Sequence, residues 1–221
     1  ELLGSEPGEI IFTSGATEAV NLAIKGLWEV YRSKGNHIIT CATEHPAVLD
    51  TCHYLEKLGA EISLLDVDSK GMIDLEKLEA AIKPETIFGA FMYANNETGV
   101  IQNIDEIAAI LRRKGVLFFS DATQAVGKID LNVKRDDIPI LAFSAHKMYG
   151  PKGVGMLFVK RGTGIKPVSF GGGQERGRDQ AVFRDAVRCP RPGRAAGGGG
   201  LVPRGAAHRR ARPRPRLTAR P

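Results

Sequence analysis

The sequence predicts an α/β fold in which a mostly parallel sheet carries helices on both faces, giving three layers. Short apolar runs alternate along the chain with longer stretches whose apolar residues recur every three or four positions. This alternation is typical of repeated βα units around a parallel sheet. Polar motifs follow several of the apolar runs, where ligands bind in open α/β sheets.

Strands are expected where apolar or β-branched runs are bounded by turn residues. They cover residues 9–13, 37–41, 62–67, 87–93, 116–120, 138–143 and 155–159. The last of them is the candidate for an antiparallel strand.

Helices are expected where the apolar period is 3.6 residues. They cover residues 17–33, 46–58, a short stretch starting at 74, and 105–114. In the first, Val20, Ile24 and Leu27 fall on one face. Pro46 suits the first turn of the second helix, and Asp74 is a suitable N-cap for the third.

The charge of the chain is distributed very unevenly. Its 221 residues carry a net charge of +6 and are enough for one large α/β domain. Residues 178–221 hold 12 arginines, no lysine and two aspartates, a net of +10, whereas residues 1–177 hold 19 basic and 23 acidic residues, a net of −4. We therefore predict a domain over 1–177 and a disordered Arg/Pro/Gly-rich tail over 178–221.

The origin of this tail has three interpretations. An abrupt change to Arg, Pro, Gly and Ala is typical of a GC-rich gene read in the wrong frame, and LVPRG at 201–205 resembles a protease-tag scar. A genuine tail would bind nucleic-acid phosphates non-specifically at low salt. The first residue is Glu1 rather than Met, and we expect the domain to be incomplete at both ends.

The cysteine and hydropathy patterns argue against a disulfide-rich, metal-binding, membrane-spanning or secreted protein. The three cysteines form neither a disulfide framework nor a paired metal spacing. There is no apolar run long enough to span a membrane and no charged-then-apolar leader. We therefore expect a cytoplasmic protein without a metal site.

The segment SAHKMYGPKG at 144–153 is the most informative motif. Its Lys147 follows Asp121 by 26 positions, and an apolar run delivers Asp121 to the rim of the predicted sheet. Pyridoxal phosphate (PLP) needs a lysine amine to bind its aldehyde and a carboxylate to keep its pyridine nitrogen protonated. A solvated surface lysine would account for Lys152 and Lys160 but poorly for Lys147 in this setting. The glycine spacing differs from GxxxxGK[ST], which excludes a P-loop.

Further polar residues suit the same cofactor, and each has a simpler alternative. The turn before Ala16 and Thr17 presents helix N-terminal amides to a phosphate, unless it is only a helix cap. His45 would stack on a flat cofactor and move protons, unless it is an ordinary loop histidine. Asn96 would contact a substrate carboxylate or phenolate oxygen, unless it is a turn residue. Gln124 would donate to the ring oxygen.

Near the lysine, Ser144 and His146 have side chains suited to holding a phosphate while Lys147 reaches the aldehyde. A bare Asp121 at a strand end is otherwise a helix N-cap. Taken together, these residues make a PLP enzyme the leading hypothesis.

In order and spacing, six motifs resemble the cysteine desulfurases of the NifS/IscS type, which are class V aminotransferase-like, fold-type I PLP enzymes. The motifs are FTSGATEA at 12–19, TEH at 43–45, NNETG at 95–99, DATQAVGK at 121–128, SAHKMYGPKG at 144–153 and GGGQER at 171–176. They cover residues 1–177.

The resemblance implies that Lys147 holds PLP, that His45 stacks on it and moves protons, and that Asp121 pairs with the ring nitrogen. It assigns the phosphate to Ala16, Thr17, Ser144 and His146, and the ring oxygen and its surroundings to Gln124 and Asn96. The implied reaction converts L-cysteine to L-alanine and leaves sulfur as an enzyme persulfide. The sulfur then passes to an acceptor or scaffold protein for iron–sulfur cluster or thio-cofactor assembly, and the enzymes are homodimers.

The sequence also departs from this family. After GGGQERG the family has an Arg-Ser-Gly-Thr stretch, whereas this chain reads RDQ at 178–180. The later loop bearing the nucleophilic cysteine and the small C-terminal domain are not recognisable. Cys41 and Cys52 are expected to be buried, and Cys189 lies outside such a motif, so we expect little activity of this chain alone. Alternatives are another class V enzyme, such as a selenocysteine lyase or an aminotransferase, and a non-catalytic product that binds nucleic acid through its tail.

Overall fold

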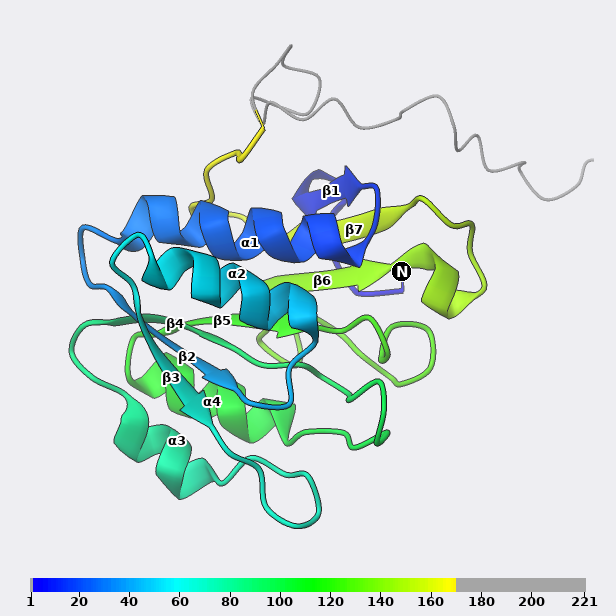
Figure 1. The fold of residues 1–221 in the computed structure, drawn as a ribbon. Helices are drawn as coiled ribbons and strands as arrows, with labels where there is room; N and C mark the ends of the chain where they lie inside the picture. Colours follow the sequence, from blue (N-terminus) through cyan, green and yellow to red (C-terminus); the bar gives the residue numbers. More distant parts are fainter. Residues whose placement is uncertain (1, 170–221) are drawn as a thin grey trace, which may run out of the picture. The chain divides into compact units, whose positions relative to one another are not determined.

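Residues 2–169 are described by a computed structural model, and they form a seven-stranded sheet with helices on both faces (Figure 1). This confirms the predicted fold class. The GGGQER motif at 171–176, Cys189 and the predicted tail over 178–221 lie outside the described residues.

The strands occupy the sheet in the order β1-β7-β6-β5-β4-β2-β3. Their bounds are β1 Ile10–Thr13, β2 His37–Cys41, β3 Glu61–Leu65, β4 Thr86–Ala90, β5 Leu117–Asp121, β6 Ile140–Ser144 and β7 Gly155–Val159. β7 pairs antiparallel with both β1 and β6, and the remaining pairs are parallel. The candidate antiparallel strand is therefore confirmed.

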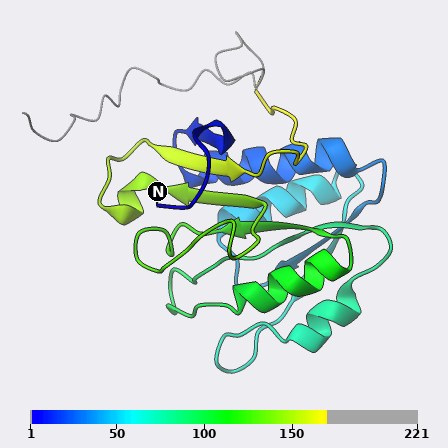
Figure 2. The same ribbon diagram turned by 180° about the vertical axis from the view of Figure 1, so that it is seen from behind.

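Two pairs of helices cover the sheet within residues 2–169. They are α1 Ala16–Tyr31, α2 Pro46–Glu56, α3 Leu75–Ala81 and α4 Ile104–Arg113, with short 3-10 helices η1 Pro7–Glu9 and η2 Ala145–Met148. Figures 1 and 2 show α1 and α2 on one face and α3 and α4 on the other. None of these helices combines the length and apolar character needed to cross a membrane.

The core lies in two apolar layers, one on each side of the sheet. Neighbouring residues of β5 serve different layers, because successive side chains of a strand point to opposite faces. Phe119 belongs to the same apolar layer as Leu27 of α1, and Phe118 belongs to the same layer as Leu111 of α4. The sheet thereby holds its strand ends in fixed positions.

Local sequence signals explain several of the element boundaries. The side chain of Asp74 accepts hydrogen bonds from the backbone N–H groups of Glu76 and Lys77, at 3.0 and 3.2 Å, so the predicted N-cap of α3 is confirmed. Pro46 opens α2, as expected from its fixed φ and missing N–H.

Two strands end earlier than the sequence predicts. β4 ends at Ala90 instead of residue 93, because its pairing with β2 stops there, although Tyr93 N–H still donates to the carbonyl of Asp121 at 2.8 Å. β3 ends at Leu65, and Val67 instead forms a single antiparallel bridge with Ile73. In both places tertiary pairing, rather than apolar character, sets the end of the strand.

His37 makes the stability of this sheet depend on pH. Its ring is 0% exposed, with Nδ1 2.7 Å from the Thr86 hydroxyl and Nε2 2.8 Å from the Ser63 hydroxyl. Burial and, next, the positive charge of Lys83 lower its pKa below the ordinary 6.5. As the pH falls below 6.5, His37 is therefore protonated more readily in the unfolded chain than in the folded protein. The contribution of neutral His37 to folding stability is present above pH 6.5 and is lost as the pH falls through the lowered pKa.

We expect the free energy of unfolding to decrease as the pH is lowered from about 8 to about 5. The decrease should be smaller in His37→Gln, whose side chain cannot be protonated. Urea denaturation at each pH measures this. His53→Gln is the matched control, because His53 is exposed. An unchanged pH dependence in His37→Gln would contradict the assignment.

Candidate functional site

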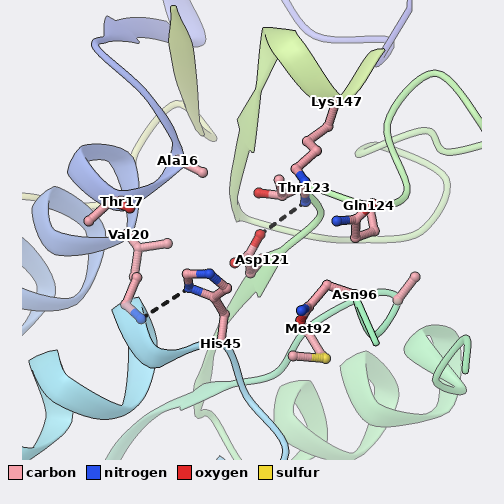
Figure 3. A pocket seen from close by; sticks show the side chains of 12 residues that line it. Ala16, Thr17, Val20, His45, Met92, Asn96, Asp121, Thr123, Gln124 and Lys147 are labelled. Carbon is pink, nitrogen blue, oxygen red and sulfur yellow. Dashed lines mark hydrogen bonds between the residues drawn. The ribbon is translucent and has the colours of Figure 1, made fainter. Parts of the chain in front are cut away.

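A pocket opens at the carboxyl end of the parallel strands, where five segments meet (Figure 3). It contains about 510 Å³ of space between protein atoms, open to solvent in part. It is lined by Ala16, Thr17, Val20, His45, Ala47, Met92, Ala94, Asn96, Asp121, Thr123, Gln124 and Lys147. Seven of the nine predicted site residues therefore line one pocket, and Ser144 and His146 do not.

The N-terminus of α1 forms one wall of the pocket. Its N-cap is Gly15, which has no side chain that could accept a hydrogen bond from the first helical amides. The Ser14 backbone N–H and hydroxyl donate to the Glu18 carboxylate, at 2.7 and 2.6 Å. The first amides of a helix carrying no side-chain cap suit an anionic group.

Asp121 ends β5 and lies 7% exposed beneath the pocket. Its Oδ1 accepts a hydrogen bond from the Thr123 backbone N–H at 2.9 Å. Burial raises its pKa above the ordinary 3.8, while hydrogen bonding from Thr123 and the closeness of His45 work in the opposite direction. No lysine or arginine within residues 2–169 forms an ion pair with it. A cationic group bound in the pocket would stabilise its carboxylate.

Lys147 enters the pocket from η2, the short helix that follows β6 (Figure 3). Its side chain points toward Asp121 and Thr123. Two backbone bonds brace the turn: Ala145 N–H donates to Val154 at 3.0 Å, and Gly150 N–H donates to Ala145 at 2.8 Å. The lysine is exposed, so its amine is accessible to a ligand entering from solvent.

Ser144 and His146 lie beside the lysine without lining the pocket. The Ser144 hydroxyl is 2.7 Å from Nδ1 of His146 and donates weakly to the Val154 carbonyl at 3.4 Å. Ser144 is 2% exposed, whereas His146 is exposed. Their predicted contact with a phosphate therefore stays a prediction.

His45 is the N-cap of α2, and its Nδ1 accepts a hydrogen bond from the Ala47 backbone N–H at 3.1 Å (Figure 3). An accepting nitrogen carries no proton, so the ring proton of neutral His45 sits on Nε2. The imidazole lines the pocket, and its stacking on a cofactor stays a prediction.

Two amide side chains, those of Asn96 and Gln124, line the pocket. Asn96 lies in the turn over residues 96–98, and Asn95 supports this turn, since its Oδ1 accepts from the N–H groups of Glu97 and Thr98, at 2.9 Å each. Lys128 Nζ donates to Oε1 of Gln124 at 3.0 Å, which leaves the amide nitrogen of Gln124 as the free donor.

Sequence reasoning missed several lining residues. Val20, Ala47, Met92, Ala94 and Thr123 also face the cavity. Of these, only Thr123 could have been found from the sequence, because the backbone N–H two positions after an aspartate often donates to its carboxylate. The others follow from where the sheet places the chain.

Comparison with known proteins agrees with this architecture. Residues 1–189 match the family profile described as Aminotransferase class-V. Over 179 residues the chain is 50% identical to cysteine desulfurase IscS of Haemophilus influenzae strain PittGG and 51% identical to that of Glaesserella parasuis serovar 5. These matches cover 80% of this chain and 44% of each relative, so the chain spans less than half the length of those relatives.

Solved structures are similar as well. A NifS-like protein superimposes with a TM-score of 0.78 and 41% identity, covering 80% of this chain and 49% of the other. SspA in complex with cysteine superimposes with a TM-score of 0.77 and 40% identity, covering 80% and 52%.

Proposed function

The chain belongs to the class V aminotransferase family, and we propose that it forms the PLP-binding part of a cysteine desulfurase. The observation that carries this proposal is that Lys147 and Asp121, from separate elements, line a single pocket. Because the chain spans less than half of the desulfurases to which it is similar, the activity of a whole enzyme is part of the proposal.

The residues of the pocket fit PLP. A lysine amine, a buried carboxylate that pairs with no lysine or arginine in residues 2–169, and a helix N-terminus with glycine at its N-cap match the aldehyde, the pyridine nitrogen and the phosphate in turn. Lys147 would hold the cofactor covalently, Asp121 would pair with the ring nitrogen, and Ala16 and Thr17 would bind the phosphate. Ser144 and His146 would support the phosphate from the lysine turn.

The remaining polar groups would orient the ring and move protons. Gln124, with its amide nitrogen free, would donate to the ring oxygen, and Asn96 would contact the same region. His45 would stack on the ring and exchange protons through Nε2, because Nδ1 is committed to Ala47. When bound, PLP supplies an electron sink for carbanion formation at the α-carbon of an amino acid.

L-Cysteine is the proposed substrate. The relatives at about half identity are cysteine desulfurases, and SspA was solved in complex with cysteine. The product would be L-alanine, with sulfur kept as a persulfide for an acceptor protein. We also propose that the full enzyme is a cytoplasmic homodimer.

The two described cysteines are poor candidates for the persulfide carrier. Cys41 and Cys52 are each 1% exposed. Burial raises the pKa of both thiols, that of Cys52 to about 12, and only a thiolate is a good nucleophile. We therefore place the proposed carrier outside residues 2–169, and we expect this 221-residue chain alone to release little sulfide.

Titration of this chain with PLP is expected to produce a visible absorbance band, and L-cysteine is expected to change that band while little sulfide forms. D-Cysteine is the control amino acid. A response to L-selenocysteine without a response to L-cysteine would favour a selenocysteine lyase, and a response to other small amino acids would favour an aminotransferase. No band at all would reject the proposed cofactor site and favour a non-catalytic product.

Sustained sulfide release would show that a cysteine of this chain carries the sulfur. Serine substitutions at Cys41, Cys52 and Cys189 would then identify it.

A further inference from the structure

We propose that Glu44 is a positioning residue that holds together the two walls of the pocket on which His45 and Asn96 stand. The inference rests on the proposed PLP site and adds to it a residue that does not itself line the cavity.

Glu44 directly precedes His45, but its side chain turns inward and is only 5% exposed. Its Oε1 accepts a hydrogen bond from the Met92 backbone N–H at 2.6 Å, and Met92 lines the pocket. A second bond runs beside it, from Nδ2 of Asn95 to the Thr43 carbonyl at 3.1 Å. Two hydrogen bonds thus join residues 43–45 to residues 92–95, which come from different strand ends.

The second carboxyl oxygen of Glu44 needs explanation. Oε2 is buried and has no hydrogen-bond partner among the described residues. The ionisable groups that interact with Glu44 are Asp121 of β5, Cys41 of β2 and Cys52 of α2, and none of these is a cation. A charged carboxylate in this position would be costly, because burial without a counter-ion disfavours the ionised form.

The burial of Glu44 and the absence of a cation beside it among the described residues favour its protonated form. Burial raises its pKa well above the ordinary 4.5, the Met92 hydrogen bond opposes this, and the negative charge of Asp121 raises the pKa further. A neutral Glu44 still accepts the Met92 hydrogen bond through its carbonyl oxygen. A protonated Glu44 would also place no second negative charge beside Asp121, whose carboxylate would then be available to a cationic ring nitrogen.

Two substitutions separate this role from a general structural one. Glu44→Gln keeps the carbonyl acceptor and is always neutral, whereas Glu44→Leu removes the acceptor at similar size. Glu97→Leu is the matched control, because Glu97 is an exposed glutamate on the Asn96 loop.

The first readout is amide hydrogen exchange at Met92 without PLP. We expect exchange at least ~10-fold faster in Glu44→Leu, and rates within ~3-fold of wild type in Glu44→Gln and Glu97→Leu, since only the leucine at position 44 removes the acceptor of that N–H. Equal protection of Met92 in wild type and Glu44→Leu would overturn the inference, whether or not PLP binds.

The second readout is PLP affinity and the pH profile of the visible band. We expect the Kd for PLP to be at least ~10-fold higher in Glu44→Leu than in the wild type. Glu44→Gln should keep the wild-type affinity and pH profile. Loss of binding in Glu44→Gln, or a shifted pH profile, would show that the ionised carboxylate is required and overturn the inference.

The two proposals fail in different ways. If wild-type protein does not bind PLP, the proposed function is wrong and the Met92 exchange still decides the role of Glu44. If Glu44→Leu does not fold, Glu44→Gln remains decisive, because a neutral acceptor must preserve Met92 protection.

Discussion

Replacing Lys147 by alanine is expected to abolish the visible absorbance band that PLP produces with this chain. The band requires a covalent bond to an amine, and Lys147 is the only lysine lining the pocket of the described residues. Its side chain points toward Asp121, the carboxylate proposed to hold the ring nitrogen (Figure 3). Loss of the amine would remove the attachment while leaving the residues proposed to bind the phosphate and the ring unchanged.

Lys152→Ala is the matched control for this experiment. Lys152 lies in the same glycine-rich turn, is exposed and does not line the pocket, so its removal should leave the band unchanged. Borohydride reduction followed by peptide mapping should place the modified lysine at position 147. A band that persists in Lys147→Ala, or a modification mapped to Lys152 or Lys128, would refute the proposed site.

Replacing Gly155 by alanine is expected to destabilise the fold and weaken PLP binding together. Gly155 begins β7, between Thr13 of β1 and Ser144 of β6. A Cβ at this position would overlap the backbone of Gly15, the N-cap of α1. Because the obstacle is backbone rather than a flexible side chain, the turn that presents the α1 amides must shift.

We expect the free energy of unfolding to fall by about 1–3 kcal/mol, as for other overpacked sites, and the PLP affinity to fall about tenfold. Urea denaturation and PLP titration measure the two effects.

Gly15→Ala is the control at the other residue of this contact. Its φ of 167° is extended backbone, and no heavy atom lies within 4 Å of a Cβ built there. We expect its stability to change by less than about 0.5 kcal/mol. Equal destabilisation by the two substitutions would mean that the close approach of Gly155 to Gly15 is not the cause.

Local patterns in the sequence were enough to predict the fold class and most elements. The residues of β2 and β7, the Asp74 cap and the start of α2 at Pro46 depend on period, apolar character and turn chemistry within a few positions. Parallel strands place their carboxyl ends on one rim, so polar residues after successive strands were expected to meet. Lys147, Asp121, His45 and Asn96 do line one pocket.

The sequence alone therefore determined the architecture and which polar motifs share a rim. The tertiary structure alone decided which side chains turn inward and which backbone groups they meet: Glu44 reaches Met92, 48 positions away, and Gly155 rests on Gly15. It also showed that Asn96 both lies in a turn and lines the pocket, while Asn95 accepts the hydrogen bonds that support this turn. The physical reason is that local conformation follows from neighbouring residues, whereas burial, charge state and close backbone contacts depend on segments brought together only by the folded sheet.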